Sequence, residues 1–554
     1  MENGRKAGQR DKMGKRTALL FSVLLLAGLL FWGTRDREAQ SAPGVLTPGA
    51  LSGEARQAGA LFHRLPETLD AEEVRLCFRG EELACDRETG TWYLPVDMDS
   101  ESWEKGTFTA FGEDIQVLPL IDYTILDKKT LVSEGERVPF LAWKEEEAVC
   151  TRVHVVFTGL PVVRMETDAD LDIDTVFAGN MVVYDACKEQ DWVMHSGFAA
   201  HERGQTTRAF PKKGYRVELI SVTGTGVVNE NPKSILKMRT SDSWIFYAIY
   251  SDGTKVRDKF NIELWNAFGA GQTPYDAHFG THMEYAELIV NGEYRGLYGI
   301  LEPVDCTQLS ISGQEYLYKR TRGRTLSTDL LDTAMPEEYP TLLGVEIKGK
   351  EGNGSREDWQ CFRSFVSIGE AEDAEFAQKA ENLLNMKNAA DMWLYLQMIY
   401  GEDNIYKNMF FAFKKESGGR RLYFVPWDVD LTWGNVYTDE KEDLYTVFAG
   451  ERAEEYLKWP FMDRVIELDV GGMQSVITER WSELRETVLS EEHMETVLDA
   501  CIHQVQDSGA FMRDASRWSD SHHDGDYDRM RDFIEKRMIY LDKNIKNMDE
   551  WLQD

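Results

Sequence analysis

The sequence predicts an α+β protein in which a small β-rich module precedes a mixed core and a helical C-terminal region. Short alternating apolar runs separated by acidic turns fill residues 65–149, as in half-buried strands. Farther along, hairpin patterns alternate with segments whose apolar residues recur with the period of an amphipathic helix. With 554 residues, of which 42% are hydrophobic, the chain is long enough for more than one core.

The N-terminal residues 1–34 combine a basic tail with an apolar segment. Met1–Arg16 is basic, whereas Thr17–Gly33 carries no charge. Because basic flanks remain in the cytoplasm, we expect an uncleaved membrane anchor followed by an extracytoplasmic body. A cleaved signal peptide is the alternative, although residues 39–42 match the small-residue cleavage pattern poorly. Residues 35–64 lack sustained periodicity and are expected to form a linker.

Residues 65–149 are expected to form a small β-sandwich-like module without a chemical site. Cys77 and Cys85 flank a polar turn, so they could form a disulfide across a hairpin outside the cell. The whole chain has 62 basic and 96 acidic residues, a net charge of −34. This charge disfavours nucleic acid or an anionic membrane surface as partner of the main body, and suits basic or hydroxyl-rich protein segments. The alternative is that the acidity only maintains solubility.

The predicted core, residues 150–480, opens with the strand pattern TRVHVVFTGL and continues to a possible phosphate-binding turn. Arg203 and Gly204 begin a small, hydroxyl-rich turn, after which Lys212 and Lys213 lead into a strand that carries Arg216. Backbone N–H groups of such a turn, together with one ammonium group, could cradle phosphates. A solvent-facing Lys/Arg pair is the equally weighted alternative.

The next predicted elements are a helix over Thr254–Phe268 and a hairpin that turns at Asn291-Gly292. Glu263 lies at the edge of the apolar stripe of this helix. If it is buried, its carboxylate needs a cationic partner, which Lys213 or Arg216 would supply. The alternative is an ordinary exposed glutamate.

A buried helix, Asn388–Tyr400, then leads to a second hairpin, in which the runs MFFAF and LYFV flank a turn near Ser417 and Gly418. With that turn, Asn408 and Asp428 become neighbours across the hairpin. Asp403 lies five residues before Asn408, in the preceding loop. Carboxylate and carboxamide oxygens are the ligands that a phosphate-bridging Mg²⁺ requires, and one carboxylate kept off the metal could orient an attacking hydroxyl group.

Protein kinases place an Asp, four residues, an Asn, and then a hairpin that ends at a metal-binding Asp. Asp403, Asn408 and Asp428 reproduce this order. His-Arg does not precede Asp403, and Asp428 is not part of Asp-Phe-Gly, so the sequence disfavours an ordinary eukaryotic-type kinase.

Five segments in order resemble the spore-coat CotH-type family of atypical protein kinases. They are Glu202–Leu219, Ser251–Gly269, Glu284–Asp305, Gly401–Phe413 and Tyr423–Gly434. The resemblance implies a two-lobed kinase-like core that uses ATP and Mg²⁺ to phosphorylate protein Ser/Thr at a bacterial cell surface or spore coat. The predicted α+β fold is then this core, preceded by the anchor and the module, with a helical C-terminal extension at residues 481–554.

The resemblance also assigns roles to single residues. Asp403 corresponds to the catalytic-loop Asp and Asp428 to the metal-binding Asp, with Asn408 and Asp430 as further ligands. It selects Lys213 as the phosphate contact, and it places Glu302 where the chain crosses between lobes and offers main-chain groups to adenine.

Two other classes of function stay open. The first is a catalytically silent surface scaffold or binding module with the same fold. The second is a metal-dependent nucleotide-sugar transferase, because Asp428-Val429-Asp430 is also a DxD pair. The joint presence of Asp403, Asn408 and Asp428 argues against the scaffold, and the lack of a doubly wound pattern before Asp428 argues against the transferase.

Overall fold

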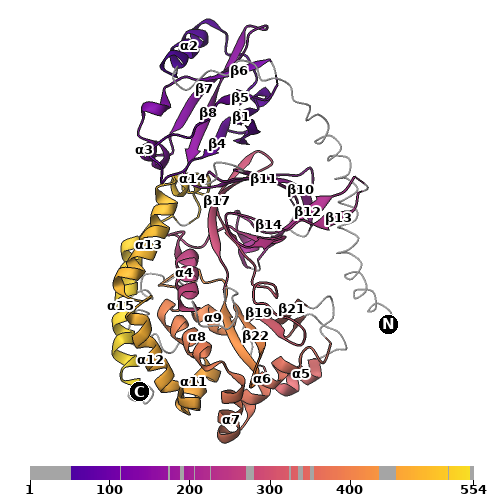
Figure 1. The fold of residues 1–554 in the computed structure, drawn as a ribbon, viewed down its shortest axis with the longest axis vertical. Helices are drawn as coiled ribbons and strands as arrows, with labels where there is room; N and C mark the ends of the chain where they lie inside the picture. Colours follow the sequence, from indigo (N-terminus) through magenta and orange to yellow (C-terminus); the bar gives the residue numbers. More distant parts are fainter. Residues whose placement is uncertain are drawn as a thin grey trace, which may run out of the picture. The chain divides into compact units, whose positions relative to one another are not determined.

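The computed structural model describes residues 51–548, except residues 113, 172–174, 187–191, 205, 225, 270–279, 323–325, 335–340, 350–354, 436–456 and 522. The fold is mixed α+β, as predicted (Figure 1). The chain forms two compact units. The first unit contains the residues up to Tyr250 with Met283–Glu302 and Ile502–Ser521, and the second contains Ser251–His282, Pro303–Cys501 and His522–Asp554.

Among the described residues, no helix has both the length and the apolar composition needed to cross a bilayer. The predicted anchor, Thr17–Gly33, lies outside the described residues.

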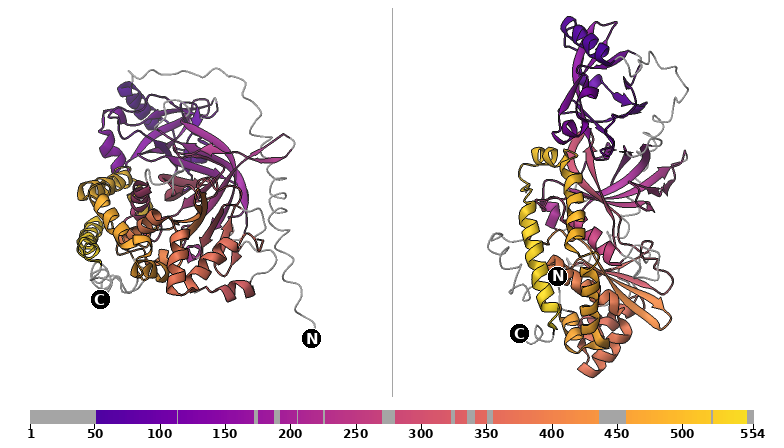
Figure 2. Two further views of the ribbon diagram at one scale, coloured as in Figure 1. Left: turned by 60° about the horizontal axis from the view of Figure 1, so that its bottom comes forward. Right: turned by 60° about the vertical axis from the view of Figure 1, so that its left-hand side comes forward.

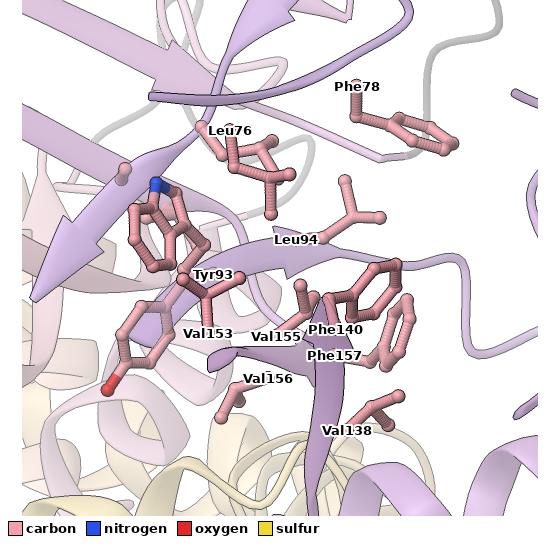
Figure 3. Close-up of a cluster of buried hydrophobic side chains, with 14 of the residues drawn as sticks. Leu76, Phe78, Tyr93, Leu94, Val138, Phe140, Val153, Val155, Val156 and Phe157 are labelled. Atoms are coloured by element: carbon pink, nitrogen blue, oxygen red, sulfur yellow. The ribbon is translucent and has the colours of Figure 1, made fainter. Parts of the chain in front are cut away.

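The N-terminal module of the first unit contains two sheets that share one core. A five-stranded sheet has the order β3-β4-β8-β7-β6, and a three-stranded sheet has the order β2-β1-β5. Leu76 and Phe78 of the smaller sheet pack with Leu94, Phe140 and other apolar side chains of the larger sheet (Figure 3). The strands are β1 Leu76–Phe78, β2 Glu81–Glu82, β3 Ala84–Asp86, β4 Thr91–Pro95, β5 Phe108–Ala110, β6 Ile115–Pro119, β7 Arg137–Lys144 and β8 Val149–Thr158, and helix α3 is Lys128–Ser133.

Two boundaries of this module differ from the sequence prediction. The segment TRVHVVFTGL, expected to open the core at residue 150, is largely strand β8, which pairs with β4 and β7 inside the module. Leu51–Arg64, expected to be part of a linker, forms helix α2. Gly53 and Gly59 weaken its helical pattern in the sequence, whereas packing of Ala58 against Leu141 and Trp143 supports the helix in the structure.

Cys77 and Cys85 are free thiols rather than the disulfide that the sequence suggested. They lie on strands of different sheets, β1 and β3. The pKa of the Cys77 thiol is raised to about 11 and that of the Cys85 thiol to about 12. Burial is the largest cause of both shifts. Neither thiol is therefore an effective nucleophile near neutral pH.

We predict that both thiols resist alkylation in the folded protein at pH 8, because the thiolate is the reactive form. Mass spectrometry after iodoacetamide treatment should show both residues modified only once denaturant is present. A peptide cross-linked through Cys77 and Cys85 in a non-reduced digest would contradict this prediction.

The rest of the first unit is built on a sheet of order β11-β10-β9-β17-β18-β16-β12-β13, in which β11 also pairs with β12. The predicted hairpin at Asn291-Gly292 is confirmed, with φ of 52° and 74° in its turn. Helix α14, Ala510–Arg517, lies within the predicted helical C-terminal extension and packs on β18. The strands are β9 Val162–Glu166, β10 Phe177–Tyr184, β11 Val193–Arg203, β12 Gly214–Val222, β13 Val228–Glu230, β16 Ser243–Tyr247, β17 Met283–Val290 and β18 Glu293–Leu301, with β14 Lys233–Ser234 and β15 Thr240–Ser241 as a separate pair.

The second unit contains a five-stranded sheet of order β20-β21-β19-β22-β23 with helices beside it (Figures 1 and 2). Phe362 of α6 packs on Phe411 of β22, and Asn388 of α8 bonds to Phe424 of β23. The strands are β19 Tyr316–Arg320, β20 Thr341–Leu342, β21 Val345–Lys348, β22 Met409–Glu416 and β23 Gly419–Pro426. The helices are α4 Arg257–Gly269, α5 Thr328–Ala334, α6 Gln360–Glu370, α7 Asp373–Leu383, α8 Met386–Ile399, α9 Glu402–Tyr406, α11 Pro460–Glu467, α12 Met473–Arg485 and α15 Tyr527–Ile545, and α13 Glu491–Gln506 contributes residues to both units.

Candidate active site

Asp403 is carried by a short helix that follows a buried one. Helix α8 begins after Asn385, whose side chain caps it by accepting a hydrogen bond from Asn388 N at 3.0 Å. The helix ends at Ile399, and the left-handed backbone of the following Tyr400, with φ of 58°, turns the chain sharply. After Gly401, helix α9 places Asp403 in its first turn. A buried helix thus anchors the segment that bears the predicted base.

Asn408 lies just before the first strand of the predicted hairpin, and Asp428 lies two residues after the end of its second strand. Met409 pairs with Pro426 in the register of β22 and β23, and Trp427 N donates to Asn408 O at 3.0 Å. The backbones of Asn408 and Asp428 are both left-handed, with φ of 57° and 61°. Asn and Asp tolerate this conformation better than most residues, and such backbones cluster at functional sites. The register therefore places Asn408 opposite Trp427, one residue before Asp428, so the predicted pairing of Asn408 with Asp428 is shifted by one residue.

Two side chains hold the Asp403 carboxylate. Asn408 Nδ2 donates to Asp403 Oδ2 at 2.7 Å, and Lys407 Nζ lies 3.2 Å from Asp403 Oδ1. Burial is the largest influence on the pKa of Asp403 and raises it, Asp428 raises it further, and Lys407 and Asn408 oppose the rise. The result is a pKa above the ordinary aspartate value. A carboxylate whose pKa moves toward neutrality is a better general base.

The carboxylate of Asp258 lies against the loop that joins Asp428 to Asp430. Asp258 is in the first turn of α4 and is 4% exposed, and its Oδ1 accepts a hydrogen bond from Val429 N at 3.1 Å. Its Oδ2 is buried and has no hydrogen-bond partner in the described part of the chain. Burial first, and then the charges of Asp430 and Asp428, raise the pKa of Asp258 well above its ordinary value.

Helix α4 also fixes the loop after Asp428 through residues that the sequence analysis missed. Asn261 Nδ2 donates to Val429 O and to Thr432 Oγ1, both at 2.8 Å, and Asn261 Oδ1 accepts from Trp433 Nε1 at 2.6 Å. Asp258 and Asn261 are one turn apart and both buried. Two polar residues at that spacing in a largely buried helix were the available signal, since buried polar side chains need partners.

The predicted metal ligands differ in how accessible they are. Asp428 is exposed, whereas Asp430 is buried and its Oδ2 accepts a hydrogen bond from Ser251 Oγ at 2.6 Å. Asn408 uses Nδ2 to bond Asp403, which leaves Oδ1 to accept or coordinate. In the described ranges, no group of three or more His, Cys, Asp or Glu side chains is arranged to hold a metal ion. Mg²⁺ commonly needs only one or two protein carboxylates besides phosphate and water, and the roles of Asn408, Asp428 and Asp430 as its ligands stay predictions.

The sequence matches a known protein family. Residues 200–541, more than half of the chain, match the family described as CotH kinase protein. The chain belongs to the CotH kinase family. No curated protein matches the sequence.

The residues that were predicted to bind phosphate lie together in the first unit. Arg203 pairs with Gly214 across β11 and β12, next to Lys213. Lys213 Nζ donates to Arg208 O at 2.6 Å and lies 3.9 Å from Glu202 Oε2. Arg216 lies on the same strand, opposite His201. The side chains of Arg203, Lys213 and Arg216 are each partly exposed, as a ligand contact requires.

Gly204, in the predicted phosphate-binding turn of this CotH-family chain, has a conformation that requires glycine. Its φ is 110°, and a Cβ atom there would lie 1.9 Å from Thr207 Oγ1. A side chain at this position would therefore strain the turn. The predicted role of this turn in binding phosphate stays a prediction.

Glu263 and Glu302, the other two predicted cofactor residues, have different surroundings. The side chain of Glu263 is 39% exposed and lies 3.3 Å from Lys259 Nζ on the same helix, as the exposed-glutamate alternative expected. Its pairing with Lys213 or Arg216 stays a prediction. Glu302 is buried, and its Oε1 accepts a hydrogen bond from Arg239 N at 2.8 Å. The chain passes from the first unit to the second between Glu302 and Pro303, where the crossing was expected.

Proposed function

We propose that this CotH-family protein transfers phosphate from ATP to Ser or Thr hydroxyl groups of proteins, in a Mg²⁺-dependent reaction. The two units are then the two lobes of a kinase-like core. The observation that carries the proposal is that Asp403, Asn408 and Asp428 all lie at the open end of one hairpin. In addition, the pKa of Asp403 is raised. This is the set of groups that phosphoryl transfer needs.

Each residue has a role in this proposal. Asp403 accepts the proton of the substrate hydroxyl group, while Lys407 and Asn408 keep its carboxylate in place. Asn408 and Asp428 hold Mg²⁺, which when bound neutralises the charge of the phosphates. Asp430, which is buried, helps to keep these two residues in place. In the first unit, Lys213 contacts phosphate together with Arg203, Gly204 and Arg216. The main chain at Glu302 binds adenine.

We also propose that the protein acts at a bacterial cell surface or spore coat, held by the N-terminal anchor. Its net charge of −34 suits basic or hydroxyl-rich protein acceptors.

The test uses the full chain, [γ-³²P]ATP, MgCl₂ and a Ser/Thr-rich acceptor protein. We expect label on Ser or Thr, and we expect EDTA to abolish the transfer because the phosphate charge is then unneutralised. Parallel reactions contain UDP-sugars or the acceptor without nucleotide. Hydrolysis of a UDP-sugar without phosphate transfer would replace the kinase by the transferase, and nucleotide-independent acceptor binding without transfer would replace it by the scaffold.

A further inference from the structure

The side chain of Asn404 joins the two segments that carry the proposed metal ligands. Asn404 lies in α9, directly after Asp403, and is 1% exposed. Its Nδ2 group donates to Trp427 O at 2.7 Å and to Asn408 O at 3.2 Å, and it lies 3.5 Å from Asp428 O. One amide group thus contacts main-chain oxygens on both sides of the hairpin end.

The chemistry of these contacts fixes the orientation of the Asn404 amide. Its Oδ1 is buried and has no hydrogen-bond partner among the described residues. If the amide were rotated by half a turn, Oδ1 would face the carbonyl oxygens of Asn408 and Trp427, which are acceptors and would repel it. The side chain therefore keeps its two N–H donors toward the hairpin and leaves its acceptor unused.

The contacted residues have backbones that need support. Asn408 and Asp428 are left-handed, a conformation that persists in residues other than glycine when the surroundings impose it. Asn404 contacts the carbonyl group of each of these two residues. A side chain placed in this way determines how far apart the two segments lie and which way their carbonyl groups point.

We propose that Asn404 is a positioning residue that sets the separation of Asn408 and Asp428 for binding a divalent cation. The inference rests on the proposed function, because it takes these two residues as the cation ligands. Asn404 acts through the main chain of the ligands and touches neither the cation nor the substrate. Without its donors, the two segments lose their shared restraint, and the cation site becomes poorly formed.

The chain offers a matched control in Asn388. This asparagine is also buried, and its amide bonds the main chain of β23, with Nδ2 donating to Phe424 O at 3.1 Å and Oδ1 accepting from Phe424 N at 2.7 Å. It contacts β23 two residues before Pro426, the last residue of the strand, and within the described part of the chain it makes no hydrogen bond to Asn408 or Asp428. Removing it deletes an equivalent amide without altering the proposed restraint.

The experiment titrates full-length wild type, Asn404→Ala and Asn388→Ala with Mn²⁺ and measures free Mn²⁺ by electron paramagnetic resonance. Loss of groups that orient metal ligands typically weakens metal binding by about 10–100-fold. We expect that loss for Asn404→Ala and less than about 3-fold for Asn388→Ala, although thermal unfolding midpoints fall in both. Asn404→Ser, which retains one donor, should recover part of the affinity and serves if Asn404→Ala does not fold.

Equal Mn²⁺ affinity in wild type and in the Asn404 variants would overturn the inference while leaving the proposed function intact. An equal loss in Asn404→Ala and Asn388→Ala would also overturn it, since a general loss of stability would then explain both. If wild type binds no Mn²⁺ and transfers no phosphate, the proposed function fails first and the inference fails with it.

Discussion

Replacing Asp403 by Ala should lower kcat for phosphate transfer by about 10²–10⁴-fold, the contribution of a positioned general base. The reason is that Asp403 is the carboxylate whose pKa is raised by burial and whose two oxygens are held by Asn408 and Lys407. The measurement is initial rate against acceptor concentration at saturating Mg-ATP. KM for Mg-ATP should change far less than kcat, because the base acts on the acceptor hydroxyl group.

The neighbouring Glu402 is the matched control for this experiment. It is a partly buried carboxylate on the same short helix, and burial, followed by the charge of Asp403, raises its pKa as well. Glu402→Gln removes an equivalent charge, and we expect it to keep most of the wild-type kcat. Comparable turnover in Asp403→Ala and wild type would defeat the kinase assignment, and an equal loss in both variants would point to the charge of the helix rather than to a base.

The position of the hairpin was predictable because its signals are local. Two apolar runs and a turn containing Gly418 define a register without reference to the rest of the molecule. In the structure Glu416 pairs with Gly419, which leaves Ser417 and Gly418 as the turn, as expected. Strand pairing then carries that register to the other end, so Asn408 lies beside Trp427. A site formed by the ends of one hairpin is therefore within reach of sequence analysis.

The contribution of helix α4 was not predictable in the same way. Its apolar period directed attention to Glu263, which is only partly exposed and pairs with Lys259 on the same helix. Asp258 and Asn261 instead contact the loop after Asp428, which lies more than 150 residues away in the sequence. Such contacts depend on how the helix packs, and a helical period identifies which face is apolar without identifying its partner.

The adjacent residues Lys212 and Lys213 illustrate the same limit. The sequence offers two identical side chains before one strand, and only the fold distinguishes them. Lys213 is partly exposed near Glu202, whereas Lys212 is fully buried. Lys212 Nζ lies 2.6 Å from Asp514 Oδ1 on helix α14, 302 residues away along the sequence, a contact that the sequence pattern does not indicate. Burial is the largest influence on the pKa of Lys212 and lowers it.

Replacing Asp514 by Ala should destabilise the first unit by about 3–5 kcal/mol, because removing one partner leaves the other charge buried without compensation. Both side chains are 0% exposed, and Asp514 Oδ1 also accepts a hydrogen bond from Leu297 N at 2.9 Å. The measurement is native-state hydrogen exchange of the β18 peptides, since Leu297 N lies in that strand and reports on the first unit directly. Exchange there should become faster by a factor that matches the lost free energy.

The exposed pair Lys536–Asp532 isolates the effect of burial, because its Nζ and Oδ2 are also 2.6 Å apart while its side chains are 56% and 47% exposed. Asp532→Ala should change stability by about 0.5 kcal/mol or less. The double variant Lys212→Met, Asp514→Leu should recover much of the loss of Asp514→Ala, since apolar side chains of similar size do not leave a buried charge. If Asp514→Ala and Asp532→Ala lower the stability by the same amount, distance rather than desolvation controls the energy of these pairs, and the Lys212–Asp514 pair contributes no more than a surface contact.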